Sequence, residues 1–128
     1  MGNPDNIRCR SLWERRFCKY LDENKNVLRW GFELISIPYV SIVDDRLHKY
    51  IPDFIVETKN DEQTKTISIV EIKPKKQTIE PTRKNQNKSS LQEHIQYFTN
   101  LSKWETATKY CSQRGWVFRI ITEQELFG

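Results

Sequence analysis

The stretch from Tyr50 to Pro74 limits the possible folds of this chain more than any other part of it. Two runs rich in β-branched and aromatic residues, Tyr50–Glu57 and Thr66–Lys73, flank the polar segment Lys59–Glu62. Such residues favour strands, and a short polar turn between two strands favours antiparallel pairing. The sequence therefore predicts a β-hairpin, or a close variant of one, over residues 50–74.

Three charged side chains fall at one end of this hairpin. Side chains alternate along a strand, so Glu71 and Lys73 leave the second strand on the same face. Asp53 stands near the start of the first strand, which antiparallel pairing places beside the end of the second. Two carboxylates held close together are costly unless a cation lies between them. We therefore expect a cation at this edge of the sheet.

The rest of the chain predicts an α/β fold. Apolar residues spaced by three and four indicate helices, and short apolar runs indicate strands. The expected elements are a helix at Ser11–Leu21, a strand at Trp30–Ile37, the hairpin, a helix at Ser90–Gln113, a strand at Trp116–Ile121 and a short helix capped by Thr122 and Glu125. The long helix should bury Leu91, Ile95, Phe98, Leu101, Trp104, Thr108 and Cys111. We predict a single domain, residues 1–128, with a central mixed sheet of four or more strands flanked by helices.

The positive charge is concentrated just after the hairpin. The whole chain has a net charge of +4, yet residues 73–88 hold six basic residues against Glu80 alone: Lys73, Lys75, Lys76, Arg83, Lys84 and Lys88. Residues 75–89 are almost without apolar side chains, so we expect a mobile basic loop. A concentrated positive charge favours a polyanionic partner such as DNA; a solvated surface loop is the alternative.

Several classes of protein are disfavoured. No apolar run approaches the roughly 20 residues needed to span a membrane, and no signal-peptide pattern opens the chain. Cys9, Cys18 and Cys111 are odd in number and lack the spacing of zinc ligands, so we expect free thiols in a reducing compartment. Gly-rich phosphate loops and Ser/His/Asp patterns are also missing.

The residue types at the hairpin edge suit phosphodiester hydrolysis. Mg²⁺ prefers oxygen ligands and is commonly bound through one or two carboxylates, which Asp53 and Glu71 would provide. A bound divalent ion acidifies water and offsets charge on the reacting oxygens. Lys73 would hold the nucleophilic water or stabilise the charged phosphate.

Pro52-Asp53 followed by Glu71-x-Lys73 resembles the motif of the PD-(D/E)xK nucleases. Further stretches resemble the head-completion nucleases of T-even-type tailed phages, and more widely the transposon end-cleaving endonucleases. These stretches are Ser11–Arg15, Asn26–Glu33, Ile37–Tyr39, His48–Phe54, Glu71–Pro74 and Lys103–Phe118. The similarity therefore extends over most of the chain.

The resemblance implies a Mg²⁺-dependent DNA endonuclease, with Mn²⁺ as a substitute, whose active-site set is Glu14, Asp53, Glu71 and Lys73. Asp53 and Glu71 would bind the metal, with Glu14 as a further candidate ligand. It also implies a role in phage head completion before tail attachment, portal, neck or other head proteins as partners, and action in the host cytoplasm or retention in the virion. DNA would contact Lys75, Lys76, Arg83, Lys84, Lys88, Arg15 and Arg16.

Some alternatives remain open at this point. The chain could instead be a transposase-associated or junction-cleaving nuclease, or a non-enzymatic DNA-binding or head-assembly protein on the same fold. Spacing alone favours Glu14 as a capping partner of Ser11, whereas the resemblance places it at the metal site. His48 is expected to be structural rather than a phosphate ligand, and Gln96 and Lys103 are expected on a solvated helix face rather than at the site.

Overall fold

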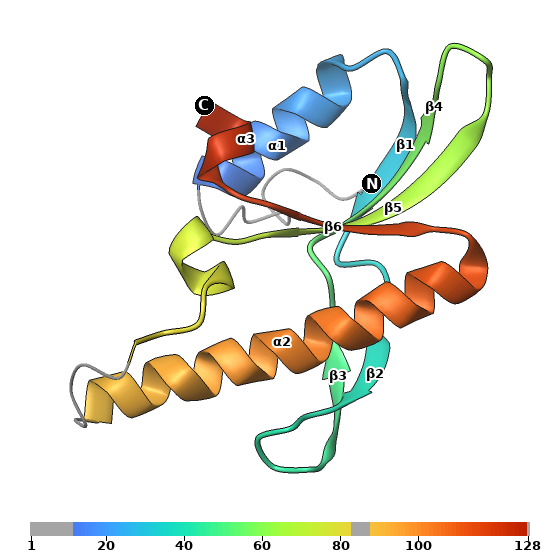
Figure 1. The fold of residues 1–128 in the computed structure, drawn as a ribbon. Helices are drawn as coiled ribbons and strands as arrows, with labels where there is room; N and C mark the ends of the chain where they lie inside the picture. Colours follow the sequence, from blue (N-terminus) through green and yellow to red (C-terminus); the bar gives the residue numbers. More distant parts are fainter. Residues whose placement is uncertain (1–11, 83–87, 128) are drawn as a thin grey trace.

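The computed structural model describes residues 12–82 and 88–127 of the 128-residue chain. Figure 1 shows the helices and strands in chain order. They are α1 (Leu12–Glu23), β1 (Val27–Phe32), β2 (Ile37–Val40), β3 (Leu47–Tyr50), β4 (Phe54–Lys59), β5 (Lys65–Ile72), the 3₁₀ helix η1 (Lys75–Thr78), α2 (Lys88–Arg114), β6 (Val117–Ile121) and α3 (Glu123–Phe127).

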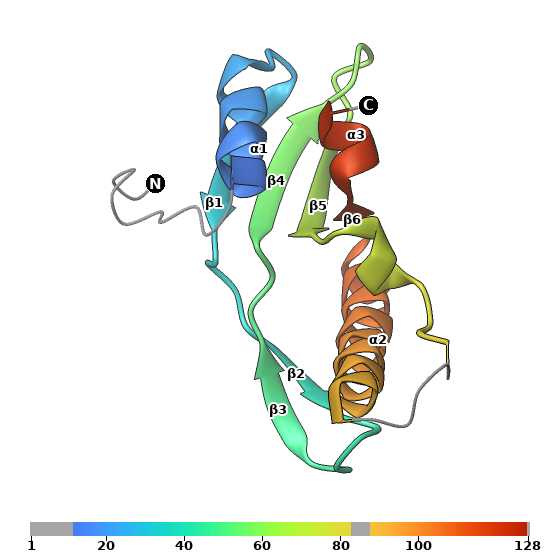
Figure 2. The same cartoon turned by 90° about the vertical axis from the view of Figure 1, so that its left-hand side faces the viewer.

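Four strands form one mixed sheet in the order β1-β4-β5-β6. β4 is antiparallel to both β1 and β5, whereas β6 is parallel to β5. β2 and β3 form a separate antiparallel ribbon, which Figure 2 shows extending away from the main sheet. The prediction of a central mixed sheet flanked by helices is confirmed.

The predicted hairpin is present as β4 and β5. Phe54 pairs with Val70 at one end of the hairpin, and Lys59 pairs with Lys65 beside the turn. The side chain of Asn60 closes this turn, because its Oδ1 accepts hydrogen bonds from the backbone N–H groups of residues 62 and 64, both at 2.9 Å. Asn favours turns for this reason.

The first strand of the hairpin is shorter than predicted, and one continuous strand over Tyr50–Glu57 is wrong. Tyr50 is the last residue of β3 and pairs with Ile37 of the ribbon, whereas β4 begins at Phe54. The fully buried Pro52 lies between the two strands. Because proline has no N–H to donate to a strand ladder, the chain leaves one sheet here and enters the other.

The predicted strand Trp30–Ile37 is also divided between the two sheets. β1 ends at Phe32, and β2 begins at Ile37. Glu33 lies between them with a φ angle of 52°, and this left-handed conformation turns an extended chain. Apolar side chains continue across the turn, so the hydrophobic pattern did not reveal it.

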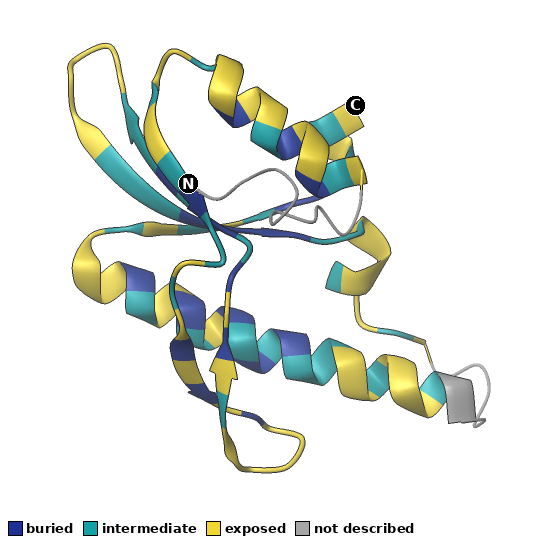
Figure 3. Ribbon diagram, turned by 180° about the vertical axis from the view of Figure 1, so that it is seen from behind, coloured by how far each residue is buried: buried dark blue, intermediate teal, exposed yellow. Residues whose placement is uncertain are grey.

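Helices cover both faces of the main sheet. On one face, Phe17 and Leu21 of α1 pack against buried side chains of β4, β5 and β6. On the other side, Trp104 and Ala107 of α2 pack against the ribbon and against partly buried residues of β6. Figure 3 shows the buried residues gathered where the helices meet the strands. None of the helices in the described ranges is long and apolar enough to cross a membrane.

The buried face of α2 differs from the prediction. Leu91 and Ile95 are 58% and 36% exposed, because the first turns of α2 extend beyond the ribbon and the sheet (Figure 1). Thr108 is also exposed. Within residues 90–114, the buried residues of this helix are Asn100, Ser102, Trp104, Ala107 and Cys111.

Two predicted helix boundaries in the C-terminal region, the end of α2 and the start of α3, are confirmed. Gly115 follows α2 with a φ angle of 72°, as a helix-terminating glycine should. Thr122 and Glu125 form a capping box: the Glu125 carboxylate accepts hydrogen bonds from the backbone N–H and the hydroxyl of Thr122, both at 2.7 Å. These bonds begin α3 directly after β6.

The basic segment starts with regular structure. Its first residues form η1 and are held to α3, because the Lys75 N–H donates to the Glu123 carboxylate at 2.8 Å. Its last residues, 88 and 89, belong to α2. Arg83 and Lys84 lie outside the described residues, so the expectation of a mobile loop there stays a prediction.

Replacing Gly115 by Ala should lower the free energy of unfolding by about 1 kcal/mol, because the left-handed conformation is unfavourable for residues with a Cβ. No atom lies within 4 Å of the position that this Cβ would occupy, so the loss is conformational rather than steric. Gly115→Asn is the matched control and should cost less, since Asn tolerates this conformation. Urea denaturation measures both; equal stability of wild type and Gly115→Ala would contradict the argument.

Candidate active site

Asp53 lies where the chain crosses from the ribbon into the main sheet. Its backbone carbonyl accepts a hydrogen bond from the Glu33 N–H at 2.9 Å. Its side chain reaches the last residue of β5, because Oδ2 accepts a hydrogen bond from the Ile72 N–H at 2.8 Å. The predicted juxtaposition of Asp53 with the end of the second hairpin strand is confirmed.

Glu71 is buried, with 6% of its surface exposed. Its neighbours Val70 and Ile72 pack in the cluster beneath α1, so strand alternation directs Glu71 to the opposite face. There its Oε1 accepts a hydrogen bond from the Tyr50 hydroxyl at 2.9 Å, and its Oε2 lies 3.7 Å from the Lys73 Nζ. Glu71 and Lys73 therefore share a face, as predicted.

Burial and a neighbouring carboxylate both disfavour the charged form of Glu71. Burial raises the pKa of Glu71 to about 7, and the negative charge of Asp53 acts in the same direction. Lys73 and the Tyr50 hydroxyl oppose the rise by stabilising the charged form. A cation bound beside the pair would favour ionisation of both carboxylates.

Tyr50 is a site residue that sequence reasoning missed. It is 3% exposed, and burial followed by the charge of Glu71 raises its pKa. The phenol therefore stays neutral and donates its hydrogen bond to the Glu71 carboxylate. The available signal was a tyrosine in a run that was expected to be buried, since a buried Tyr hydroxyl needs a polar partner.

Lys103 does not lie on a solvated helix face, contrary to the expectation. It is half-buried on α2, and its Nζ lies 5.7 Å from the centroid of the Tyr50 ring. Burial lowers the pKa of Lys103; Glu71 raises it and Lys73 lowers it further. Gln96 matches the expectation better: it is exposed and donates a hydrogen bond to Asn100 Oδ1 at 3.0 Å.

Glu14 is buried in the first turn of α1, with 8% of its surface exposed. It shares a helical stripe with Phe17 and Leu21, which face the sheet. This turn of α1 meets α3, because the rings of Trp13 and Phe127 lie 6.0 Å apart. The competing interpretation, a cap on Ser11, involves a residue outside the described part of the chain.

The donor set fits a hard divalent ion with a partial protein shell. Asp53 and Glu71 present two interacting carboxylates, and Mg²⁺ is commonly held by one or two carboxylates, with water and substrate oxygens completing its shell. Within residues 12–82 and 88–127, no three His, Cys, Asp or Glu side chains lie close enough to hold one ion together. The structure thus gathers two carboxylates and not three.

The residues predicted to contact DNA are only partly described. Arg15 and Lys76 are exposed. Arg16 is also exposed but is engaged with α3, where its Nε donates to the Leu126 carbonyl at 2.6 Å and its guanidinium lies 4.7 Å from the Phe127 ring centroid. The Lys75 ammonium donates to Gln124 at 3.1 Å. Arg83 and Lys84 and the side chain of Lys88 lie outside the description.

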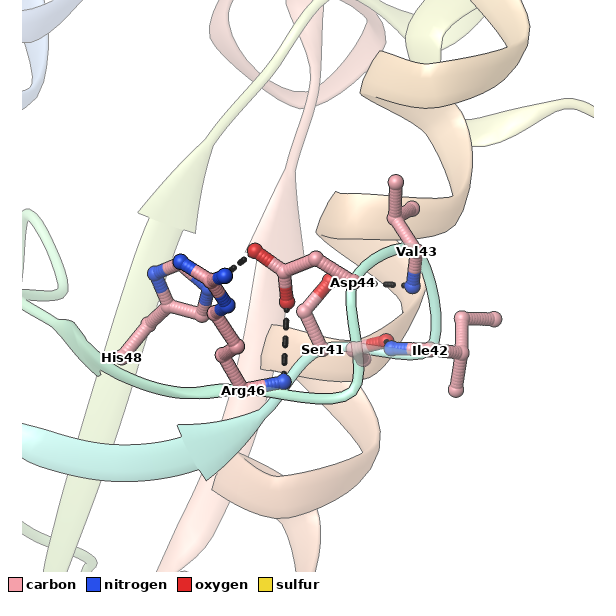
Figure 4. Close-up of polar contacts among 7 residues, drawn as sticks. Ser41, Ile42, Val43, Asp44, Arg46 and His48 are labelled. Carbon is pink, nitrogen blue, oxygen red and sulfur yellow. Dashed lines mark hydrogen bonds and ion pairs between the residues drawn. The ribbon is translucent and has the colours of Figure 1, made fainter.

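His48 has structural partners in the turn between β2 and β3. Its Nε2 lies 2.7 Å from Asp44 Oδ2, and its ring stacks on Tyr39 at 5.5 Å between centroids. Asp44 also accepts a hydrogen bond from the Arg46 N–H at 3.0 Å, as Figure 4 shows. These contacts support the structural role expected for His48.

Two comparisons connect this arrangement to known proteins. The family model described as TnsA-like endonuclease N terminal matches residues 24–123. The Head completion nuclease of Enterobacteria phage T4 is 32% identical over 130 residues, which cover 98% of this chain and 84% of that protein. No solved structure gives a significant match.

The mixed sheet, with its Asp…Glu-x-Lys edge, and the family match define the class: this chain belongs to the TnsA-like endonuclease family. Within that class it is a homologue of the Head completion nuclease of phage T4. The resemblance inferred from the sequence is confirmed.

The free energy of unfolding of the metal-free protein should depend on pH through the ionisation of Glu71. Its pKa is raised from 4.5 to about 7, so the folded protein holds a proton that the unfolded chain has released between these pH values. The free energy of unfolding should therefore be highest below pH 4.5 and should fall towards pH 7, by up to about 1.4 kcal/mol per pH unit.

Urea denaturation at several pH values in EDTA tests this dependence. Glu71→Gln should flatten the fall, because it removes the proton exchange while keeping an oxygen for Tyr50. The control Glu62→Gln alters an exposed carboxylate in the turn of the same hairpin and should keep the wild-type slope. A steep fall retained in Glu71→Gln would show that another group causes it.

Proposed function

We propose that this protein is a divalent-metal-dependent DNA endonuclease that acts during phage head completion. The observation that supports the proposal most strongly is the juxtaposition of Asp53, Glu71 and Lys73 at one edge of the sheet. Asp53 reaches the end of β5 through the Ile72 N–H, and Lys73 lies 3.7 Å from Glu71. Family membership supports endonuclease chemistry independently.

Asp53 and Glu71 are the residues that would hold Mg²⁺, or Mn²⁺ in its place. When bound, the ion would supply an acidified water and stabilise charge on the phosphate oxygens. Tyr50 orients Glu71 through its hydrogen bond to Oε1. Lys73, on the same face, would position the attacking water or bind the negatively charged phosphate.

The biological setting is inferred from the relative's name, Head completion nuclease. We infer that the substrate is DNA and that portal, neck or other head proteins are candidate partners. We also infer action in the infected host's cytoplasm, with or without later retention in the virion. A transposase-associated nuclease is the second candidate, favoured by the TnsA-like family match. A non-enzymatic DNA-binding or head-assembly module is less supported, since Glu14, Asp53, Glu71 and Lys73 are all present.

The basic residues give the protein a route to bind the DNA backbone. Arg15 on α1 and Lys76 on η1 are exposed cations. Along the sequence, Lys75, Arg83, Lys84 and Lys88 add further positive charge. Arg16 adds to it beside α3. We propose that this set contacts phosphates without reading sequence.

Asp53→Asn should remove nearly all cleavage of supercoiled, linear and branched DNA in Mg²⁺ or Mn²⁺, and EDTA should do the same to the wild type. Melting temperature should stay unchanged or rise, because the change relieves repulsion with Glu71. Lys73→Met should abolish cleavage with little effect on folding. Matched controls are Asp61→Asn in the hairpin turn and Lys65→Met at the start of β5, both exposed. Full activity in Asp53→Asn or Lys73→Met would refute the assignment.

Glu14→Gln distinguishes the two roles considered for this residue. Gln can still cap the first turn of a helix but has no charge to offer a metal ion or its bound water. If Glu14 belongs to the active site, cleavage should be lost while the melting temperature changes little. Unreduced cleavage in Glu14→Gln would assign it to helix capping alone; Glu23→Gln, exposed in the last turn of α1, is the control.

A further inference from the structure

We propose that Lys103 is a second phosphate-binding cation of the active site, contributed by α2 to the backbone of the nucleic acid substrate. The inference rests on the proposed function and deepens it. It adds a substrate contact from an element outside the hairpin that provides Asp53, Glu71 and Lys73.

The first support for the proposal is the position of Lys103. Its Nζ lies 5.7 Å from the centroid of the Tyr50 ring, and the hydroxyl of the same ring donates to Glu71. Glu71 and Lys73 both act electrostatically on the Lys103 ammonium. Lys103 on α2 and Lys73 directly after β5 therefore both interact electrostatically with the Glu71 carboxylate.

The second support is that Lys103 makes no direct salt bridge among the described residues. In the part of the chain that the structure describes, the Lys103 ammonium makes no salt bridge or hydrogen bond, and its contact is with the face of the Tyr50 ring. The Glu71 carboxylate is already engaged by Tyr50 and Lys73. Withdrawing a charge from water without pairing it is costly, and a cation–π contact offsets only part of that cost.

A phosphodiester supplies the anion that this arrangement lacks. A purely apolar role on the helix would favour an apolar side chain at this position, like that of the neighbouring buried Trp104. A half-buried lysine whose ammonium makes no salt bridge among the described residues instead suits a ligand that arrives with its own negative charge. The partner chemistry is therefore a nucleic acid backbone phosphate.

The test compares Lys103→Met, Lys103→Arg and the control Lys109→Met, which alters an exposed lysine of the same helix. Binding of linear duplex DNA is measured by fluorescence anisotropy in EDTA at several salt concentrations, and cleavage is measured in Mg²⁺. Lys103→Met should reduce the slope of log affinity against log salt by about 0.9, the value for one phosphate contact on duplex DNA. It should also lower kcat/KM at least about tenfold.

Lys103→Arg should keep the salt slope and restore part of the cleavage, and Lys109→Met should match the wild type in both. A wild-type salt slope in Lys103→Met would overturn the proposal, even if its melting temperature falls, because a structural role predicts that result. If the wild type cleaves no DNA with any divalent ion, the proposed function fails, while the slope in EDTA still decides the assignment of Lys103.

Discussion

The Glu71 carboxylate is buried close enough to that of Asp53 for the two charges to repel each other. Leaving two such groups together is unfavourable unless each is held by donors and the pair can accept a cation. The fold supplies the donors from three places: the Ile72 amide for Asp53, and the Tyr50 hydroxyl and the Lys73 ammonium for Glu71. The mostly apolar end of β5 therefore carries two interacting carboxylates, each held by donors of this chain.

The crossing of the chain at residues 51–53 makes this arrangement possible. Tyr50 belongs to the ribbon and Phe54 to the main sheet, so one short connection places a hydroxyl donor from one sheet against a carboxylate of the other. Buried Pro52 ends the pairing of both strands here. The candidate site therefore lies where the two sheets meet, with Tyr50 from β3 and Glu71 from β5.

α2 stabilises that junction and contributes to it. Trp104 and Ala107 pack on the ribbon and reach β6, which holds the ribbon and the main sheet together around Glu71. The same helix places Lys103 against the Tyr50 ring. The packed face of α2 therefore borders the candidate site.

Local sequence patterns were enough to predict the hairpin, the shared face of Glu71 and Lys73, the placement of Asp53 beside them, and the helix boundaries at Gly115 and Thr122. Each of these follows from strand alternation, antiparallel pairing or local capping, which act between residues that are neighbours along the chain or across one turn. Three features depend instead on contacts between distant parts of the chain: the division of residues 50–57 between two sheets, the hydrogen bond from Tyr50 to Glu71, and the buried face of α2. Helical spacing identifies candidate stripes, but which one is covered, and how far along the helix, depends on the layer packed against it. The sequence pattern places Lys103 on a solvated face for that reason, because it cannot show that the Tyr50 ring, far away along the chain, lies beside this side chain.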